Sequence, residues 1–73
     1  MATIHRYTES IEKKDGNLMT IGEFKENVKS GRFIDYDGWG YPVKNDLYMK
    51  RCFFPSEIDR IPKDATHFLW FNK

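Results

Sequence analysis

Residues 19–31 read MTIGEFKENVKSG and carry the clearest structural signal in this 73-residue chain. Thr20 and Glu23 form the pattern T-x-x-E, a capping box in which each side chain accepts a hydrogen bond from the other residue's backbone N–H. Met19 precedes the cap and Phe24 takes the fourth helical position, which is the spacing of a hydrophobic staple. The stretch therefore predicts a helix that begins directly after Thr20.

The predicted helix is short and amphipathic. Ile21, Phe24 and Val28 recur at helical spacing and form a narrow apolar stripe. Charged side chains occupy the remaining positions: Glu23, Lys25, Glu26 and Lys29. Gly31 favours the left-handed conformation that ends a helix. We expect a helix over residues 21–29 whose apolar stripe packs on a sheet.

The next segment, RFIDYDGWGYPV at residues 32–43, indicates a β-hairpin. Two extended runs flank Asp37-Gly38, a pair that favours a type I′ turn. Gly40 predicts a bulge or a close approach to the backbone, and Pro42 predicts an edge or an irregularity. In this register one face of the hairpin carries Ile34, Tyr36, Trp39, Tyr41 and Val43.

The remaining segments complete a small sheet. Residues 44–46 favour a turn before a predicted strand over residues 47–54, and Pro55 to Ile58 favours a single helical turn. Residues 66–71, THFLWF, are apolar on both faces and predict a central strand with the helix on one side. The predicted fold class is α+β, with one short helix packed on a mostly antiparallel sheet of three to four strands.

Residues 1–18 differ from the rest of the chain. ATIHRYT favours a short strand, whereas ESIEKKDGN is polar and ends in a turn signal. We therefore expect an N-terminal extension over residues 1–18, as an edge strand or a mobile arm, before a single domain over residues 19–73.

Charge, hydropathy and cysteine content narrow the function classes. Twelve Lys and Arg against eleven Asp and Glu give a net charge of +1, which argues against strong nonspecific binding to nucleic acid. The sequence has neither an apolar run long enough to span a membrane nor a secretory-type N-terminus, so we expect a cytoplasmic protein without membrane contact. Cys52, the single cysteine, is interpreted as a small buried apolar residue.

The aromatic content is high for a chain of this length. Aromatic residues make up 16% of the sequence, more than a small core holds, so some rings are expected at the surface. Tyr and Trp are enriched where proteins bind partners. The predicted binding site therefore comprises Asp35, Tyr36, Trp39, Gly40 and Tyr41, with an ordinary core face as the alternative for the rings.

Two other patterns resemble a metal site and a catalytic site, but each has residues that do not suit that chemistry. Residues 35–46, DYDGWGYPVKND, half-match a calcium loop, but Trp39 stands where an oxygen ligand is needed and Asp46 where a bidentate Glu is needed. Asp35, Asp37 and His67 have the chemistry for acid–base work, but the turn already accounts for Asp37. We predict no catalytic residue, no metal and no cofactor.

The same rings also suit a nucleotide or single-stranded nucleic acid. Bases would stack on them while basic residues such as Arg32 and Lys44 met the phosphates, although the acids Asp35 and Asp37 oppose this arrangement. A homo-oligomer is a further alternative, because short chains gain buried core by association.

From Met19 onward the chain resembles a group of small uncharacterised phage- and prophage-encoded proteins. The resemblance covers residues 19–73 and rests on the runs MTIGEFKENVKSGRFIDYDGWGYPV, FFPSEI and THFLWFNK, which follow the pattern MTxxEF…FIDYDGxG…THxxWFN. It implies a non-enzymatic accessory protein in the host cytosol that binds a host protein or complex. One such role is inhibition of a defence complex such as CRISPR or restriction. The resemblance carries over no catalytic residue.

Overall fold

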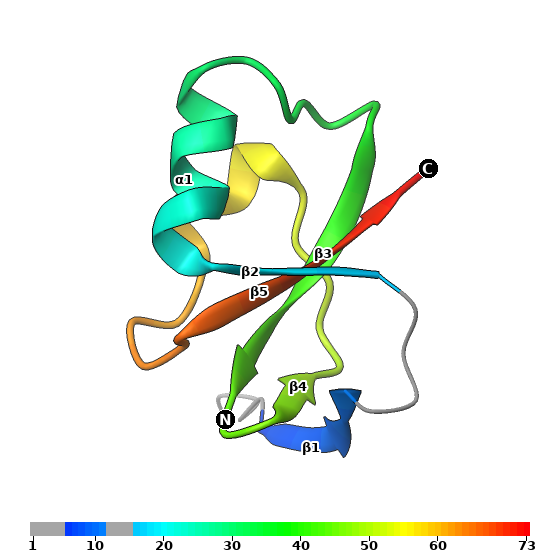
Figure 1. The fold of residues 1–73 in the computed structure, drawn as a ribbon, viewed down its shortest axis with the longest axis vertical. Helices are drawn as coiled ribbons and strands as arrows, with labels where there is room; N and C mark the ends of the chain where they lie inside the picture. Colours follow the sequence, from blue (N-terminus) through cyan, green and yellow to red (C-terminus); the bar gives the residue numbers. More distant parts are fainter. Residues whose placement is uncertain (1–5, 12–15) are drawn as a thin grey trace, which may run out of the picture.

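The structure, a computed structural model, describes residues 6–11 and 16–73. These residues form one α-helix, one 3₁₀ helix and a five-stranded antiparallel sheet (Figure 1). The elements are β1 (Tyr7–Ser10), β2 (Asn17–Thr20), α1 (Ile21–Lys29), β3 (Gly38–Lys44), β4 (Leu47–Met49), η2 (Pro55–Arg60) and β5 (His67–Asn72). The predicted α+β class is confirmed, with five strands rather than three to four.

The helix α1 has the predicted bounds and the predicted cap. Glu23 N–H donates to Thr20 Oγ1 at 3.0 Å, and Thr20 N–H donates to Glu23 Oε1 at 3.1 Å. At the other end Gly31 adopts φ +82° and its N–H donates to the Val28 carbonyl at 3.1 Å. Local sequence therefore accounts for both ends of α1.

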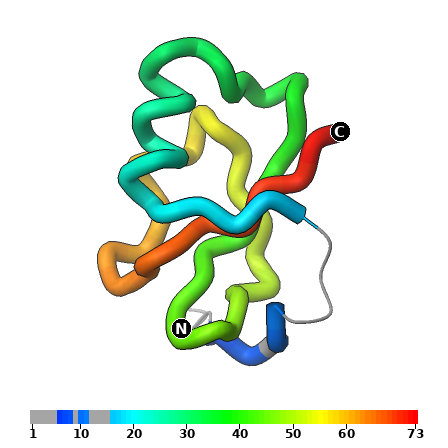
Figure 2. The backbone as a smooth tube through the Cα atoms, viewed as in Figure 1, coloured from blue at the N-terminus to red at the C-terminus, as the bar shows by residue number. Residues whose placement is uncertain are grey.

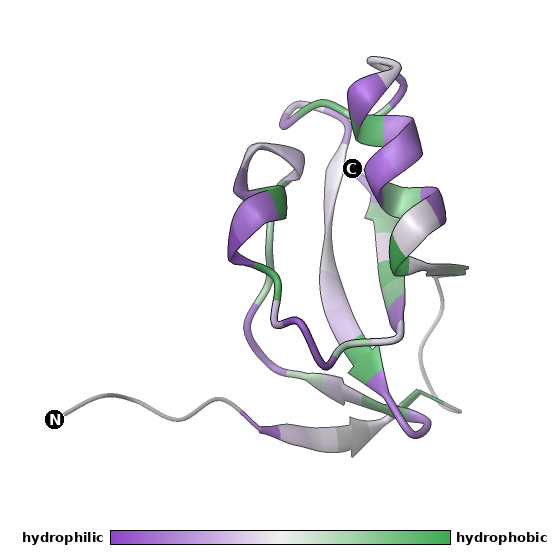
Figure 3. Cartoon of the chain, turned by 90° about the vertical axis from the view of Figure 1, so that its left-hand side faces the viewer, coloured by the Kyte–Doolittle hydropathy of each residue, from purple (hydrophilic) through white to green (hydrophobic). Residues whose placement is uncertain are grey.

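The sheet has the strand order β1-β4-β3-β5-β2, so β3 and β5 lie inside it. On β5, Phe68 and Trp70 point toward α1, and the Phe68 ring stacks on Phe24 with centroids 3.9 Å apart. We call this side of the sheet the covered face. Its buried residues are Phe24, Met49, Phe53, Ile61, Phe68 and Trp70. Both α1 and η2 contribute to it, and Figure 3 shows these two elements side by side.

The opposite side of the sheet, here called the open face, has a smaller buried cluster. It consists of Val43, Tyr48 and Leu69, with Ile11, Tyr41 and Phe71 packed against it. The strand β5 is therefore apolar on both sides, as expected for a strand inside the sheet.

The predicted hairpin around Asp37-Gly38 is wrong. Residues 32–36 form no strand, and a β-turn runs from Ile34 to Asp37, whose N–H donates to the Ile34 carbonyl at 2.9 Å. The Asp37 carboxylate closes this turn by accepting the Ile34 N–H at 3.0 Å. Phe33, the residue before the turn, stacks on Trp70 with ring centroids 4.3 Å apart. This contact packs Phe33 against the core, and residue 33 forms no β-ladder.

The hairpin lies one strand later, between β3 and β4. Asn45 and Asp46 connect them with φ of +52° and +63°, as a type I′ turn requires. The turn predicted at residues 44–46 is thus confirmed, but β4 ends at Met49 instead of residue 54. Beyond it only Phe53 bridges to the sheet, through two backbone hydrogen bonds with Gly40.

The N-terminal strands occupy the two edges of the sheet. The strand β1 pairs with β4, and β2 pairs with β5 in an unbroken register from Asn17 to Thr20. Figure 2 traces the chain from β2 through α1 to β3, β4, η2 and back along β5. The predicted extension over residues 1–18 includes residues 1–5 and 12–15, which lie outside the described residues.

The prediction that Cys52 is buried is wrong, because its side chain is exposed. It lies between the end of β4 and the bridge at Phe53, where the chain has left the sheet.

Candidate functional site

Asp35 and Tyr36 occupy the two central positions of the Ile34–Asp37 turn. Side chains at these positions of a β-turn project away from the backbone bond that closes it. Accordingly, Tyr36 is 83% exposed, and Ile34, at the first position of the turn, is 48% exposed. The turn geometry explains why the Tyr36 ring remains outside the core.

Gly40 lies in a different environment, buried in the middle of β3. A Cβ atom at this position would overlap the Phe68 ring and lie 2.6 Å from the Leu69 carbonyl oxygen. The close approach predicted from Gly40 is therefore confirmed, and the approaching group is a core ring of the covered face.

Trp39 and Tyr41 alternate with Gly40 along β3 and hence project from the open face. The single hairpin face predicted to hold Tyr36, Trp39 and Tyr41 is wrong. The structure separates the five predicted binding residues into a turn pair, a buried glycine and two rings on the open face.

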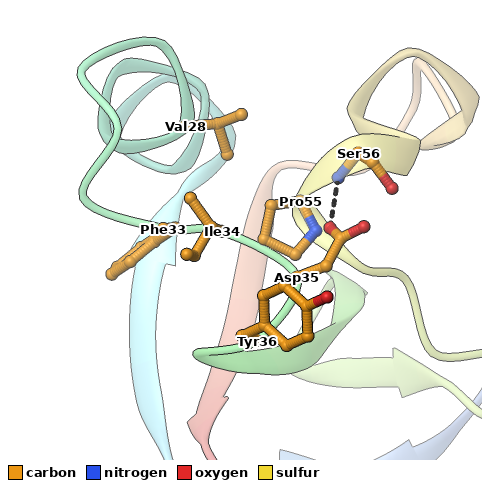
Figure 4. Close-up of a pocket in the computed structure, with 7 residues that line it drawn as sticks. All are labelled: Val28, Phe33, Ile34, Asp35, Tyr36, Pro55 and Ser56. Carbon is orange, nitrogen blue, oxygen red and sulfur yellow. Dashed lines mark hydrogen bonds between the residues drawn. The ribbon is translucent and has the colours of Figure 1, made fainter.

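The turn borders a hollow of about 400 Å³, here called the turn pocket. Figure 4 shows its residues, which come from α1, from the turn with its preceding residues, and from the start of η2. They are Val28, Phe33, Ile34, Asp35, Tyr36, Pro55 and Ser56. Phe54, which precedes Pro55 in the chain, is 41% exposed. Three of the four large apolar side chains that are exposed in the described residues thus belong to this region.

Long-range hydrogen bonds hold the turn in place. Asp35 Oδ1 accepts the Ser56 N–H at 2.9 Å and joins the turn to η2. The Lys73 N–H donates to the Asp37 carbonyl at 2.7 Å and joins the turn to the end of β5. The exposed side chains therefore sit on a pre-organised backbone, which lowers the entropy cost of binding.

Asp35 is the only acidic residue among those that line the turn pocket, and no basic residue lines it. The described residues place no Lys or Arg within ion-pair distance of it: Arg51 and Arg60 approach Glu57 instead, at 3.7 and 4.0 Å. Within the described part of the chain, the pocket is therefore an apolar hollow with one acidic side chain at its rim that no described cation pairs with.

The open face carries a row of aromatic rings. Phe71 lies 6.2 Å from Trp39 and 5.9 Å from Tyr41, measured between ring centroids, and Tyr41 lies 5.3 Å from Tyr48. Trp39, Tyr41 and Phe71 are each partly exposed. Their ring faces offer a stacking surface on β3 and β5.

A polar cluster ties β1 to the rest of the fold. The Tyr7 hydroxyl donates to Asp64 at 3.0 Å, and Lys44 Nζ lies 3.3 Å from the same carboxylate. Desolvation by burial, together with Asp64, raises the pKa of Tyr7 to about 12. The hydrogen bond from Tyr7 and the charge of Lys44 lower the pKa of Asp64.

The described residues contain no group of three His, Cys, Asp or Glu side chains placed to hold a metal ion. His67, the third member of the catalytic alternative, begins β5 with its Nδ1 2.9 Å from Thr66 Oγ1. Neither helix of the described residues is long and apolar enough to cross a membrane.

The sequence pattern predicts Asp35 and Tyr36 but does not indicate the other walls of the turn pocket. It assigns Val28 to the apolar stripe of the helix, and Pro55 and Ser56 to the start of a helical turn. The available signal is the spacing of Ile34 and Asp37, because an acid can accept the backbone N–H of the residue three positions earlier, as in a capping box.

Comparison of the chain with protein-family models, with curated proteins and with solved structures found no match.

Proposed function

We propose that this chain is a non-enzymatic binding protein that contacts a partner protein through the turn pocket. The observation that carries the proposal is the exposure of Ile34 and Tyr36 on a turn that four hydrogen bonds hold in place. Exposed apolar groups on a rigid support are typical of binding hot spots, because little freedom is lost when a partner packs on them.

The resemblance to phage- and prophage-encoded proteins suggests the setting. In that setting the chain acts in the cytosol of a bacterial host and binds a host protein or complex. Inhibition of a defence complex, such as CRISPR or restriction, is the role we propose. Such a role requires a surface on which a partner can pack, and the apolar lining of the turn pocket supports it.

Affinity capture from bacterial lysate tests partner binding. Wild-type chain, the double variant Ile34→Ala/Tyr36→Ala and the control Leu18→Ala would each be used as bait. Leu18 is 50% exposed, close to the exposure of Ile34, but it lies in β2 away from the turn. We expect a protein that the wild type and the control recover equally and that the double variant recovers at least fivefold less.

The defence role has its own test. Expression of the chain in a strain with an active CRISPR or restriction system should raise the plating efficiency of a targeted phage. The double variant, matched for expression, should lose that effect. Equal plating with and without the chain in every defence background would contradict this role.

A nucleotide or single-stranded nucleic acid is a second candidate ligand, supported by the row of Trp39, Tyr41 and Phe71 on the open face. Stacking of a base on Trp39 would quench its fluorescence. Titration of a nucleotide panel and a mixed oligonucleotide against the wild type and Trp39→Phe would measure this. Quenching that disappears in Trp39→Phe supports the second candidate, and unchanged fluorescence excludes it.

A further inference from the structure

We infer that the turn pocket takes an apolar side chain from a partner segment that also presents a Lys or Arg, and that this cation pairs with Asp35. The inference rests on the proposed function and specifies the chemistry of the partner. It joins two features of the pocket: an apolar lining and one carboxylate that pairs with no Lys or Arg of residues 6–11 and 16–73.

The apolar lining of the turn pocket suits an apolar side chain of the partner. Val28, Phe33, Ile34 and Pro55 contribute carbon surface, and the Tyr36 ring stands beside them (Figure 4). The hollow of about 400 Å³ lies at the small end of the range for ligand sites. It suits one large aliphatic or aromatic side chain, whose burial would remove both surfaces from water.

Asp35 selects the cation. Its Oδ1 accepts the Ser56 N–H at 2.9 Å, which fixes the direction of the carboxylate at the rim. A carboxylate accepts more than one hydrogen bond, so its remaining lone pairs can receive an ammonium or guanidinium donor. Among the described residues no Lys or Arg forms an ion pair with Asp35, and Arg51 and Arg60 lie 3.7 and 4.0 Å from Glu57 instead, so the cation in this inference belongs to the partner.

The two contacts act together because Ile34 and Asp35 are adjacent in one turn. An apolar side chain seated against Ile34 therefore brings its sequence neighbours close to the Asp35 carboxylate. The partner that fits is a segment in which Lys or Arg lies within about two positions of a large apolar residue.

Panning a random-peptide display library against the whole chain tests the inference. We expect enriched peptides to share a large apolar residue with a nearby Lys or Arg. Affinities of the synthetic peptides would then be measured by fluorescence polarisation at two salt concentrations. Ile34→Ala should weaken binding about tenfold, because truncation of a central contact typically costs this much.

Asp35→Asn isolates the charge, because the asparagine carbonyl still accepts the Ser56 N–H. We expect it to weaken binding about fivefold at low salt and to remove most of the salt dependence. Asp59→Asn is the matched control, because it removes one negative charge from an exposed position of η2 that does not line the pocket. Leu18→Ala controls for Ile34→Ala.

The outcomes separate the two claims. Two outcomes overturn the inference and leave the proposed function standing. In the first, the peptides need Ile34 for binding but contain no Lys or Arg. In the second, they bind Asp35→Asn and the wild type with equal affinity at both salt concentrations. No enrichment of any peptide, or enrichment of peptides whose binding Ile34→Ala leaves unchanged, also overturns the inference. The proposed function falls only when lysate capture recovers no protein that depends on Ile34 and Tyr36. Self-association of the chain that Ile34→Ala abolishes, seen by light scattering, also overturns the inference because the occupant is then a second copy.

Discussion

The two faces of the sheet carry similar aromatic residues but differ in how deeply they bury them. The covered face buries Phe24, Phe53, Phe68 and Trp70 beneath α1 and η2, whereas the open face leaves Trp39, Tyr41 and Phe71 partly in water. Residue type does not explain the difference, because each face has both Phe and Trp. What differs is whether a helix lies over the ring.

The turn pocket lies on neither the covered face nor the open face. It lies where the end of α1 and the start of η2 leave the Ile34–Asp37 turn uncovered, so its apolar groups are exposed but its backbone is held. The covered face therefore holds most of the buried core, and the proposed binding surface lies where the helices no longer cover the chain.

Among the largest effects is the one expected at Gly40, where the β3 backbone lies against the Phe68 ring of β5. Gly40→Ala would drive a Cβ into the Phe68 ring and to 2.6 Å from the Leu69 carbonyl oxygen. The backbone cannot yield without breaking the ladder, so we expect a loss of about 3 kcal/mol or more in the free energy of unfolding. Urea denaturation followed by circular dichroism would measure it.

Gly22→Ala is the control for this change. Gly22 is exposed in α1, and a Cβ there would have only Thr20 Oγ1 within reach, at 3.9 Å. Alanine should stabilise the helix by about 0.5–1 kcal/mol. A Gly40→Ala variant as stable as Gly22→Ala would show that β3 is not held against Phe68.

The next test compares Phe68 and Phe71, which lie three residues apart on opposite faces of β5. Phe68 is fully buried and stacked on Phe24, so Phe68→Ala should cost about 3–5 kcal/mol. Phe71 is only partly buried, and Phe71→Ala should cost on the order of 1 kcal/mol. Equal losses in urea denaturation would mean that the open face contributes as much to stability as the covered face.

A smaller effect is expected at Tyr7, which packs at the margin of the covered face. Burial and the hydrogen bond to Asp64 raise the pKa of Tyr7 to about 12 from 10.0, so the fold favours its protonated form. Its contribution is fully present below about pH 10 and is lost as the pH rises through about 12.

Tyr7→Phe should therefore be less stable than the wild type by about 1 kcal/mol near neutral pH, and this gap should close between about pH 10 and 12. Thermal denaturation across that pH range would test it, with Tyr36→Phe as the control for loss of an exposed hydroxyl. A gap that stays constant to pH 12 would contradict the role assigned to Tyr7.

The smallest effects on stability are expected at Ile34 and Leu18, which are 48% and 50% exposed. Each alanine variant should change the free energy of unfolding by about 0.5 kcal/mol or less. Because the two substitutions are matched in exposure, any difference between them in partner binding reports on the turn pocket. A large stability loss in Ile34→Ala alone would mean that Ile34 serves the fold.

Part of the candidate site was predictable and part was not. Asp35 and Tyr36 were found because an acid and a ring beside a turn signal are typical of a surface. The position of the turn was wrong, because Asp37-Gly38 and Asn45-Asp46 both suit a hairpin. The partners that select between them, Trp70, Ser56 and Lys73, come from distant parts of the chain.

Local sequence specifies α1 with its capping box, the helical turn after Phe54 and the strand predicted at residues 66–71, which spans His67–Asn72 in the structure. These elements rest on hydrogen bonds and side-chain periodicity within a few residues, so neighbouring residues are enough to predict them. Which rings are buried and where the turn pocket opens depend instead on tertiary contacts. Burial of a ring depends on which element lies over it, and the chain sets that through contacts between residues far apart in sequence, such as Phe24 with Phe68.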